Sequence, residues 1–248
     1  MKTGPFRKLV VLGESTVQGG GWLASDSERY ADILWRQLEL AQEQPLEYVN
    51  AGIGASVISP ASPGYDASAK PSAAERLDTQ VIEQNPDLLV IAYGLNDMRS
   101  GMDVTTFRNE MVMLLDRIAA KIDPAIVLVN VYYVTAFHHY PPFDCGSREA
   151  TLAYNEMLRT LSADRGLIYA DAHAATAGCP HTVHLDTVHA NKLGNMLIAN
   201  RIVEAVVRAC PGLADNVNRR DATTDWSKLI LPWQATGREP SDTASPGR

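Results

Sequence analysis

Short apolar runs alternate along the chain with longer segments of mixed polarity, and this alternation limits the folds that the chain can adopt. We interpret residues 9–12, 46–50, 88–92, 126–131 and 167–170 as strands, and residues 88–92 form a continuous apolar run. Runs without a polar interruption are typical of strands that are covered on both faces in a parallel sheet. We therefore predict an α/β fold, a three-layer α/β/α sandwich with a mainly parallel, five-stranded, flavodoxin-like sheet.

The segments between these runs predict the helices that cover the sheet. Their apolar residues recur at helical spacing, as Phe107, Met111 and Leu114 do within one segment. We expect helices at residues 30–40, 73–84, 104–122, 148–164 and 189–208. Three irregular segments are interpreted as loops, at residues 59–71, 132–146 and 176–185.

The alternation continues to residue 208 and decays from residue 211. We expect a single domain over residues 1–210 and a C-terminal extension over residues 211–248. The last part of the extension, residues 236–248, is polar and rich in Pro, Gly and Ser. Such a composition cannot bury a core, so we expect this part to be disordered.

Composition and charge exclude several classes of protein. The chain has 248 residues, of which 46% are hydrophobic, and a formal net charge of −7. A nucleic-acid partner is not expected, because there is no basic surplus to neutralise phosphates. A membrane span is not expected, since no apolar run approaches the roughly 20 residues that it needs. Residues 1–8 are too short and polar for a signal peptide, so we expect a cytoplasmic protein, with its oligomeric state left open.

The sequence contains three cysteines, a low and odd number that fits a reducing compartment. Cys210 ends an apolar helical pattern and is interpreted as a small core residue. Cys145 and Cys179 both lie in predicted loops. The two thiols would pair if these loops meet, and the sequence leaves both states open.

Polar residues gather after the predicted strands, where an open α/β sheet binds its ligands. Four clusters stand out: Gly-Glu-Ser at residues 13–15, Asn-Ala-Gly-Ile-Gly at 50–54, Gly-Leu-Asn-Asp at 94–97 and Asp-Thr-Val-His at 186–189. Taken alone, Ser15 fits a helix cap or a turn as well as a nucleophile. The four clusters together match the needs of serine-dependent acyl transfer, which are a base with an acid partner and donors for an oxyanion.

These four blocks resemble those of the SGNH (GDSL-type) hydrolase superfamily, and the resemblance covers about residues 8 to 208. It implies that Ser15 is the nucleophile, that His189 is the general base and then the general acid, and that Asp186 orients His189. The oxyanion hole would consist of the Ser15 N–H, the Asn96 side chain and one N–H of the second block. The resemblance also implies that no cofactor is needed.

The implied function is that of a serine esterase that hydrolyses a carboxylic ester through an acyl-enzyme. We expect a small-molecule substrate, such as an acetyl or short-acyl ester of a small alcohol or sugar. An acyltransferase or a thioesterase on the same triad is the first alternative. A metal-dependent hydrolase and a non-catalytic binding module are further alternatives, and the complete set of Ser15, Asn96, Asp186 and His189 argues against the binding module.

The chain departs from the family pattern at two positions. Glu14 stands where an Asp usually precedes the nucleophile, and we expect this longer acid to change local hydrogen bonds without abolishing activity. The usual donor glycine of the second block falls on Ala55, with Gly54 as the alternative. We favour Ala55, on the condition that its φ is negative, because only glycine adopts positive φ without strain.

Several further residues are expected to line the substrate pocket, and others are candidates for a metal site. The pocket candidates are Glu14, Trp22, Tyr132, Tyr133 and Phe137. His181, His184, Asp186 and His189 offer metal ligands, but their spacing matches no standard zinc motif, so we expect no metal. The remaining polar candidates have structural interpretations: His138 and His139 as loop residues, His173 as a hydrogen-bonded structural histidine, and Asp171 as the one alternative acid for His189.

Overall fold

The computed structural model describes residues 2–137 and 140–225 of the chain. It contains one parallel sheet with the strand order β2-β1-β3-β4-β5, which is the flavodoxin-like order. The strands are β1 (Lys8–Gly13), β2 (Glu47–Gly52), β3 (Leu88–Ala92), β4 (Ala125–Val129) and β5 (Ile168–Ala170). The predicted fold class and the parallel five-stranded sheet are therefore confirmed.

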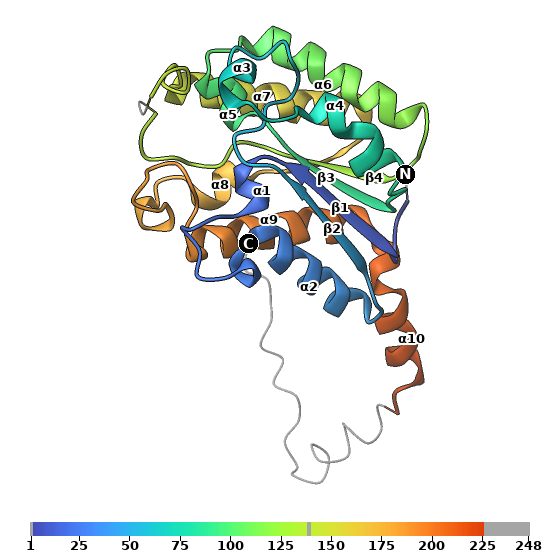
Figure 1. Cartoon of the computed structure of the whole chain (residues 1–248). Helices are drawn as coiled ribbons and strands as arrows, with labels where there is room; N and C mark the ends of the chain where they lie inside the picture. The colour runs from blue at the N-terminus through green and yellow to red at the C-terminus, as the bar shows by residue number, and fades with distance from the viewer. Residues whose placement is uncertain (1, 138–139, 226–248) are drawn as a thin grey trace, which may run out of the picture.

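Helices cover both faces of this sheet (Figure 1). One layer contains α2 (Tyr30–Gln42) and α9 (Lys192–Ala209), which pack against each other. The other layer contains α4 (Ala73–Leu77), α6 (Val104–Ala119) and α7 (Arg148–Arg165). All five residues of β3 and all five of β4 are buried, which explains why these strands are apolar throughout.

The register of the strands brings the polar clusters to one edge of the sheet. Gly13, at the end of β1, pairs with Gly52 of β2 and with Ala92 of β3. All strand pairs are parallel, so the segments that follow each strand leave the sheet on the same side. Short helices gather at this end (Figure 1): α1 (Ser15–Gln18), α3 (Tyr65–Ser68), α5 (Leu95–Arg99) and α8 (Ala172–Thr176).

Several element boundaries differ from the prediction, for local physical reasons. The helix predicted at 73–84 is α4 followed by the π-helical turn η2 (Asp78–Ile82). The last large helix begins at Lys192 rather than at residue 189, because the Asn191 side chain accepts the N–H groups of Leu193 and Gly194 and caps it there. Other boundaries shift by a few residues: the helix predicted at 104–122 and the strand predicted at 126–131 end earlier, whereas α2 and β2 end two residues later. The structure also contains α3 inside the predicted loop 59–71 and the 3-10 turns η1 (Asp26–Glu28) and η3 (Pro180–Thr182).

The first part of the C-terminal extension is ordered against the domain. It forms the 3-10 turn η4 (Pro211–Ala214) and α10 (Asp215–Thr223). Asn216 donates a hydrogen bond of 2.8 Å to the Gln42 carbonyl at the end of α2. The disorder predicted for residues 236–248 and the loop assignment of His138 and His139 fall outside the described residues.

The three cysteines carry free thiols. Cys210 is fully buried in the core, as predicted, and its thiol is free. Cys145 is exposed and Cys179 half-buried, and both thiols are free, so the two loops do not bring them into a disulfide. In the described part of the chain, no helix is both long and apolar enough to cross a membrane.

Candidate active site

A chain of two hydrogen bonds links Ser15, His189 and Asp186. The Ser15 Oγ lies 2.9 Å from His189 Nε2, and His189 Nδ1 lies 2.8 Å from Asp186 Oδ2. Ser15 is the first residue of α1, directly after β1, whereas Asp186 and His189 lie in the loop before α9. The fold thus brings together residues 174 positions apart.

The Asp186 carboxylate is fixed by its own loop. Its Oδ1 accepts the N–H groups of Val188, at 3.0 Å, and His189, at 2.9 Å. Burial raises the pKa of Asp186, but these N–H donors and the His189 ring outweigh it and lower the pKa to about 2. Asp186 is therefore ionised at neutral pH, with one oxygen left for the imidazole.

The His189 ring is largely buried, and burial is the main influence on its charge. Burial lowers the pKa of His189, Asp186 raises it, and the nearby Arg99 and His184 side chains lower it further. The net direction is downward from the usual value. The ring is therefore neutral at neutral pH, as a base that accepts the serine proton must be.

An aromatic side chain covers one face of this imidazole. The Trp22 indole stacks on the His189 ring with a centroid distance of 3.7 Å and an interplanar angle of 13°. Gly20 makes room for the indole, because a Cβ on Gly20 would lie 2.3 Å from a ring carbon of Trp22. Trp22 was expected to line the pocket, and it contacts the imidazole that is hydrogen-bonded to Ser15.

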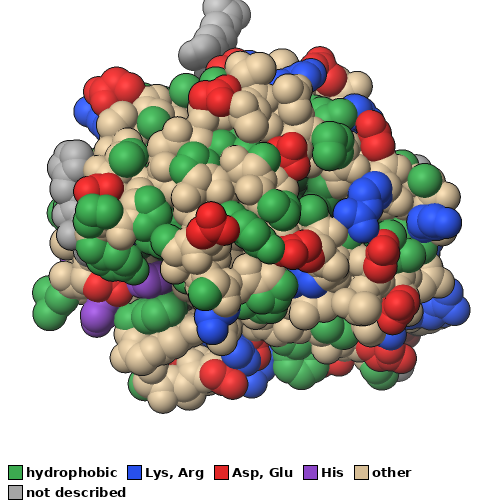
Figure 2. Space-filling model, turned by 45° about the horizontal axis from the view of Figure 1, so that its top comes forward, with side chains coloured by type: hydrophobic (Ala, Val, Ile, Leu, Met, Phe, Trp, Pro, Cys, Tyr) green, Lys and Arg blue, Asp and Glu red, His purple; other side chains and the backbone are tan. Residues whose placement is uncertain are grey.

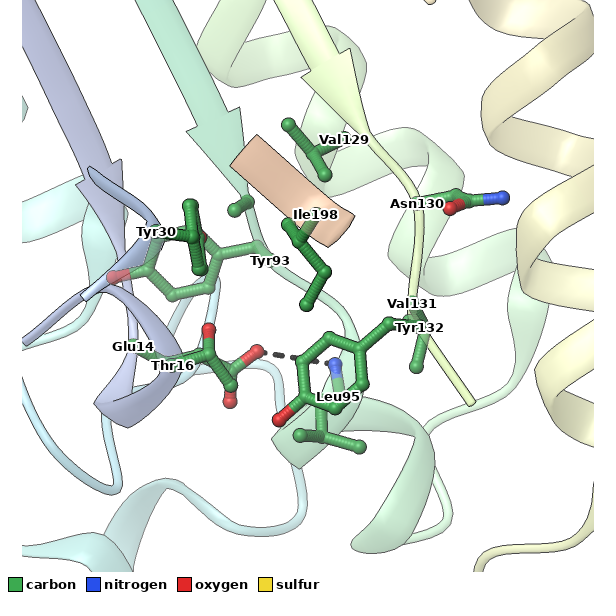
Figure 3. A pocket seen from close by; sticks show the side chains of 11 residues that line it. Glu14, Thr16, Tyr30, Tyr93, Leu95, Val129, Asn130, Val131, Tyr132 and Ile198 are labelled. Atoms are coloured by element: carbon green, nitrogen blue, oxygen red, sulfur yellow. Dashed lines mark hydrogen bonds between the residues drawn. The ribbon is translucent and has the colours of Figure 1, made fainter. Parts of the chain in front are cut away.

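Glu14 has a different position from the one expected. It is 1% exposed, and its carboxylate accepts the N–H groups of Leu95 and Asn96, both at 3.1 Å, at the start of α5 (Figure 3). Burial and the neighbouring Asp97 charge raise the pKa of Glu14 well above its usual value. Glu14 thus holds the backbone of the segment that carries Asn96, and the longer side chain is what reaches across from β1.

The N–H groups expected to bind an oxyanion differ in whether they already donate to an acceptor within the protein. The Asn96 amide donates one hydrogen bond of 3.0 Å to the Ser56 carbonyl, which leaves its second N–H unused. The Gly54 N–H donates to Gln18 Oε1, whereas no acceptor among the described residues receives the Ala55 N–H. Of the two alternatives in the second block, Ala55 is therefore the one whose donor is free.

The condition placed on Ala55 is not met. Its φ is +60°, in the left-handed region, and the expected negative φ is therefore wrong. An L-residue pays about 1–2 kcal/mol for this conformation. The turn tolerates this strain in Ala55 because the surrounding contacts fix it, among them the hydrogen bond from the Ser56 N–H to the Ile53 carbonyl at 3.2 Å.

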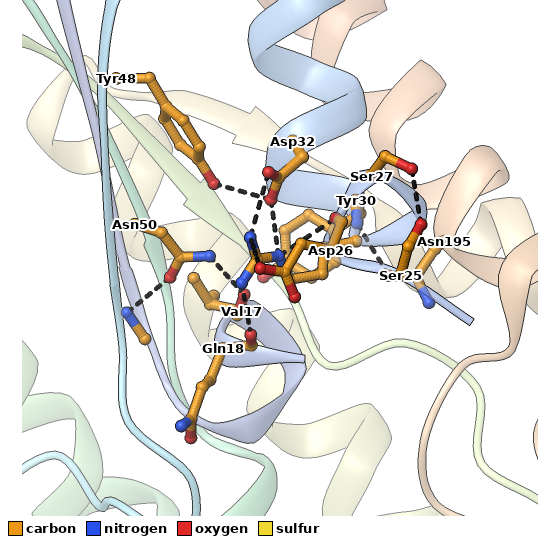
Figure 4. Close-up of polar contacts among 12 residues, drawn as sticks. Val17, Gln18, Ser25, Asp26, Ser27, Tyr30, Asp32, Tyr48, Asn50 and Asn195 are labelled. Atoms are coloured by element: carbon orange, nitrogen blue, oxygen red, sulfur yellow. Dashed lines mark hydrogen bonds and ion pairs between the residues drawn. The ribbon is translucent and has the colours of Figure 1, made fainter. Parts of the chain in front are cut away.

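Asn50 and Gly52 fix α1 against the end of β2. The Asn50 side chain donates to the Val17 carbonyl, at 2.9 Å, and accepts the Gly52 N–H, also at 2.9 Å (Figure 4). A Cβ on Gly52 would lie 2.3 Å from the Gln18 backbone nitrogen, so only glycine permits this approach. These contacts hold the short helix that begins with Ser15.

The expected pocket residues do not share one pocket. Glu14 and Tyr132 line a cavity of about 20 Å³, which has room for a water molecule and not for a substrate (Figure 3). Tyr133 and Phe137 line another cavity, of about 370 Å³. The assignment of Glu14 and Tyr132 to the substrate pocket is therefore corrected: both side chains are buried and hold the backbone of the site.

Tyr132 supports the histidine loop directly. Its hydroxyl donates to the Val188 carbonyl at 2.9 Å and accepts the Ala190 N–H at 3.3 Å, so it holds the two residues that flank His189. Nothing in its sequence surroundings separates this role from that of its neighbour Tyr133. The hydrogen bonds join residues 56 and 58 positions apart, which local patterning does not reveal.

The remaining candidates, Asp171 and His173, make contacts with residues other than His189. Asp171 accepts hydrogen bonds from Asn130 and from the Ala174 N–H, where it caps α8, and Asp186 rather than Asp171 contacts His189. The His173 backbone N–H donates to Asn130, whereas its ring packs edge-on to Tyr133. The structural interpretation of His173 thus holds for its backbone, and its ring makes an aromatic contact.

The histidine-rich segment does not form a metal cluster among the described residues. His184 Nδ1 lies 3.2 Å from Asp186 Oδ2, so a second imidazole borders the acid that contacts His189. On the face that Figure 2 shows, histidine side chains gather beside acidic and hydrophobic ones. His184, a candidate metal ligand by its sequence position, thus contacts Asp186, which the sequence pattern does not predict.

Comparison with solved structures supports the fold. The acetylxylan esterase Axe2 from Geobacillus stearothermophilus is 20% identical, with a TM-score of 0.61 over 83% of this chain and 96% of that chain. The lipase/acylhydrolase from Enterococcus faecalis is 22% identical, with a TM-score of 0.64 over 82% and 96%. The hydrolase LAE5 from the Lake Arreo metagenome is 19% identical, with a TM-score of 0.63 over 84% and 97%. No curated protein matches the chain.

The family comparison covers most of the chain. The model of the GDSL-like lipase/acylhydrolase family matches residues 11–197, which include all four polar clusters and every strand except the first residues of β1. The match extends from within β1, ahead of Ser15, into α9, behind the histidine loop. The chain therefore belongs to the GDSL-like lipase/acylhydrolase family and is a serine carboxylic ester hydrolase.

Proposed function

We propose that the protein hydrolyses an acetyl or other short-acyl ester of a small alcohol or sugar through a Ser15-His189-Asp186 triad. The observation that carries this proposal is the continuous hydrogen-bond chain from Ser15 Oγ through both ring nitrogens of His189 to Asp186. The lowered pKa of His189 supports it, since a neutral ring leaves one nitrogen free to accept a proton.

In the first step, Ser15 Oγ attacks the ester carbonyl carbon, and its proton passes to His189 Nε2. Asp186 stabilises the resulting imidazolium through Nδ1–H. The carbonyl oxygen becomes an oxyanion, for which the N–H groups of Ser15 and Ala55 and the second N–H of Asn96 are the proposed donors. His189 then returns the proton to the leaving alcohol, and water releases the acyl group by the reverse sequence.

The proposal of a short acyl group rests on the surroundings of Ser15 and on the solved relatives. A Cβ on Gly54 would lie 3.9 Å from the Ser15 Cβ, and Trp22 covers one face of the adjacent imidazole, so the Gly54 turn and the indole both border the nucleophile. Axe2 is described as an acetyl-xylooligosaccharide esterase. A serine-to-alanine and an aspartate-to-alanine variant of Axe2 are described as catalytic mutants, which is consistent with the proposed roles here.

The test is a series of p-nitrophenyl esters of increasing acyl length beside acetylated sugars. We expect kcat/KM to be highest for the acetyl and short-acyl esters. Ser15→Ala should fold normally and lose several orders of magnitude in activity, because only the oxyanion donors and substrate binding remain.

Ser27→Ala, a change of an exposed serine in the same region, is the matched control and should keep full activity. A fluorophosphonate probe should label Ser15 in the unmodified protein and nothing in Ser15→Ala. Labelling of another serine, or an active Ser15→Ala protein, would contradict the proposed nucleophile.

A further inference from the structure

Arg99, the last residue of α5, is buried, and its guanidinium has no hydrogen-bond or ion-pair partner among residues 2–137 and 140–225. The residue is 6% exposed, and its Nε is enclosed without a hydrogen bond. None of the described residues accepts a hydrogen bond from its terminal nitrogens or forms an ion pair with them. Nε alone is both enclosed and unpaired, so the two terminal nitrogens keep access to solvent.

Arg76 shows how this chain pairs an arginine that is purely structural. Arg76 is 5% exposed, similar to Arg99. Its terminal nitrogens donate to the Gly13 carbonyl, at 2.7 Å, and to the Ala51 carbonyl and the Tyr93 hydroxyl. The Nε of Arg76 is enclosed and unpaired like that of Arg99, so the two buried arginines differ in their terminal nitrogens, which among the described residues find acceptors only in Arg76.

Burial of an unpaired guanidinium is unfavourable and calls for a compensating charge. The Arg99 guanidinium lies over the ring of Phe143, 5.8 Å from its centroid. A cation–π contact of this kind compensates only part of the lost hydration and uses none of the N–H donors. A negative charge from outside the chain would supply the rest.

Arg99 shares a helix with a proposed oxyanion donor. It follows Asn96 by three residues, so the two side chains project from the same side of α5. Burial lowers the pKa of Arg99, the acidic groups of Glu14 and Asp186 oppose this shift, and Arg99 in turn lowers the pKa of His189. An anion held by Arg99 would therefore lie on the side of α5 that carries Asn96, the proposed donor to the ester oxygen.

We propose that Arg99 binds a carboxylate of the substrate, so that the enzyme favours esters that carry a negative charge near the scissile bond. The planar fork of the two terminal nitrogens matches the two oxygens of a carboxylate. This inference rests on the proposed function, because the anion must belong to an ester that reaches Ser15. The inference specifies a negative charge on the substrate, whereas membership of the family does not specify the charge.

Two pairs of esters test the proposal, each pair differing only by carboxylate against the isosteric carboxamide. In 4-acetoxybenzoate and 4-acetoxybenzamide the group lies on the alcohol part. In monomethyl glutarate and methyl glutaramate it lies on the acyl part. For at least one pair we expect kcat/KM to favour the carboxylate by about 10- to 100-fold, the effect of a hydrogen bond to a charged group.

Variants assign the preference to Arg99. Arg99→Gln should reduce the carboxylate-to-carboxamide ratio of kcat/KM to about one, and Arg99→Lys should keep part of it, because charge remains and the fork is lost. Arg108→Gln removes an exposed arginine of α6 and should leave the ratio of the unmodified protein unchanged.

The outcomes separate this inference from the proposed function. A ratio near one for both pairs in the unmodified protein overturns the role of Arg99, and so does a high ratio that survives in Arg99→Gln. These ratios are informative even if Arg99→Gln does not fold, because the unmodified protein and Arg99→Lys still report them. A Ser15→Ala protein that still hydrolyses the carboxamide esters would instead contradict the proposed nucleophile.

Discussion

At the scale of single residues, the charge state of His189 is set by opposing contributions. Burial lowers its pKa, and the ionised Asp186 raises it without reversing the net direction. The proposed mechanism requires the neutral ring, so the form competent for it persists to lower pH than it would with an ordinary histidine. The position of the acidic limb of the pH–rate profile therefore reports the balance between burial and Asp186.

We expect kcat/KM to rise with pH through a single ionisation below about 6.5, the ordinary value for histidine, and then to reach a plateau. Asp186→Asn removes the contribution that raises the pKa, so the limb should move to still lower pH. The same change should reduce the plateau by up to ~10⁴, because the carboxylate no longer fixes the tautomer of the ring.

Asp171→Asn is the matched control for this change. Asp171 caps α8, so its loss should lower the free energy of unfolding by about 1 kcal/mol at most and leave the rate nearly unchanged. The measurement is a pH–rate profile of each variant beside a denaturation curve. A large loss of rate in Asp171→Asn with little effect of Asp186→Asn would show that Asp171 is the acid that supports His189, contrary to the proposed triad.

At the scale of elements, the glycine-rich segment after α1 determines where Trp22 lies. Gly20 lies under the indole, whereas a Cβ on Gly21 would meet nothing within 4 Å. Neither glycine has the positive φ that would strain an alanine. The chain thus offers two neighbouring positions at which an added methyl group either displaces the indole or points into open space.

Gly20→Ala should therefore lower kcat/KM, whereas Gly21→Ala should leave it unchanged. The methyl group of Gly20→Ala pushes the indole off His189, and the ring loses the contact that fixes its orientation between Ser15 and Asp186. Misplacement of a reacting group on this scale costs roughly 10- to 100-fold. Steady-state kinetics on one short-acyl ester measure both variants, and an equal response from the two would refute a role for the Trp22 stack.

At the scale of the whole molecule, the parallel sheet gathers polar groups from distant segments at one edge. Acidic and basic side chains are interspersed over the face that Figure 2 shows. Among the described residues, His, Cys, Asp and Glu form no group of three that suits a metal ion. Instead, the fold directs Asp186 to His189, which is the use that a serine mechanism has for these residues.

We therefore expect EDTA or a zinc-selective chelator to leave ester hydrolysis unchanged, because the proposed mechanism needs no Lewis acid. Hydrolysis is measured before and after dialysis against the chelator, with zinc then added back. Inactivation by the chelator and recovery with zinc would favour the metal-dependent alternative and remove Ser15 from its proposed role.

The sequence by itself determined the layers and the order of the polar clusters. Continuous apolar runs such as residues 88–92 identify buried parallel strands, because every side chain of such a strand meets a covering helix. The sequence predicted the ends of the elements less accurately than their order. At α9, for example, the hydrogen bonds accepted by the Asn191 side chain set the start of the helix at Lys192, three residues after His189. Periodicity locates an element, but a cap is a single contact that a pattern does not contain.

Only the tertiary structure decided how the clustered side chains use one another. The stack of Trp22 on His189, the left-handed φ of Ala55 and the unpaired guanidinium of Arg99 are absent from any local pattern. The pocket candidates Tyr132 and Tyr133 are neighbours in sequence yet line different cavities, since successive residues of an extended segment point in opposite directions. Such features depend on packing between segments that are far apart along the chain, and packing is settled only when the whole sheet and its helices are in place.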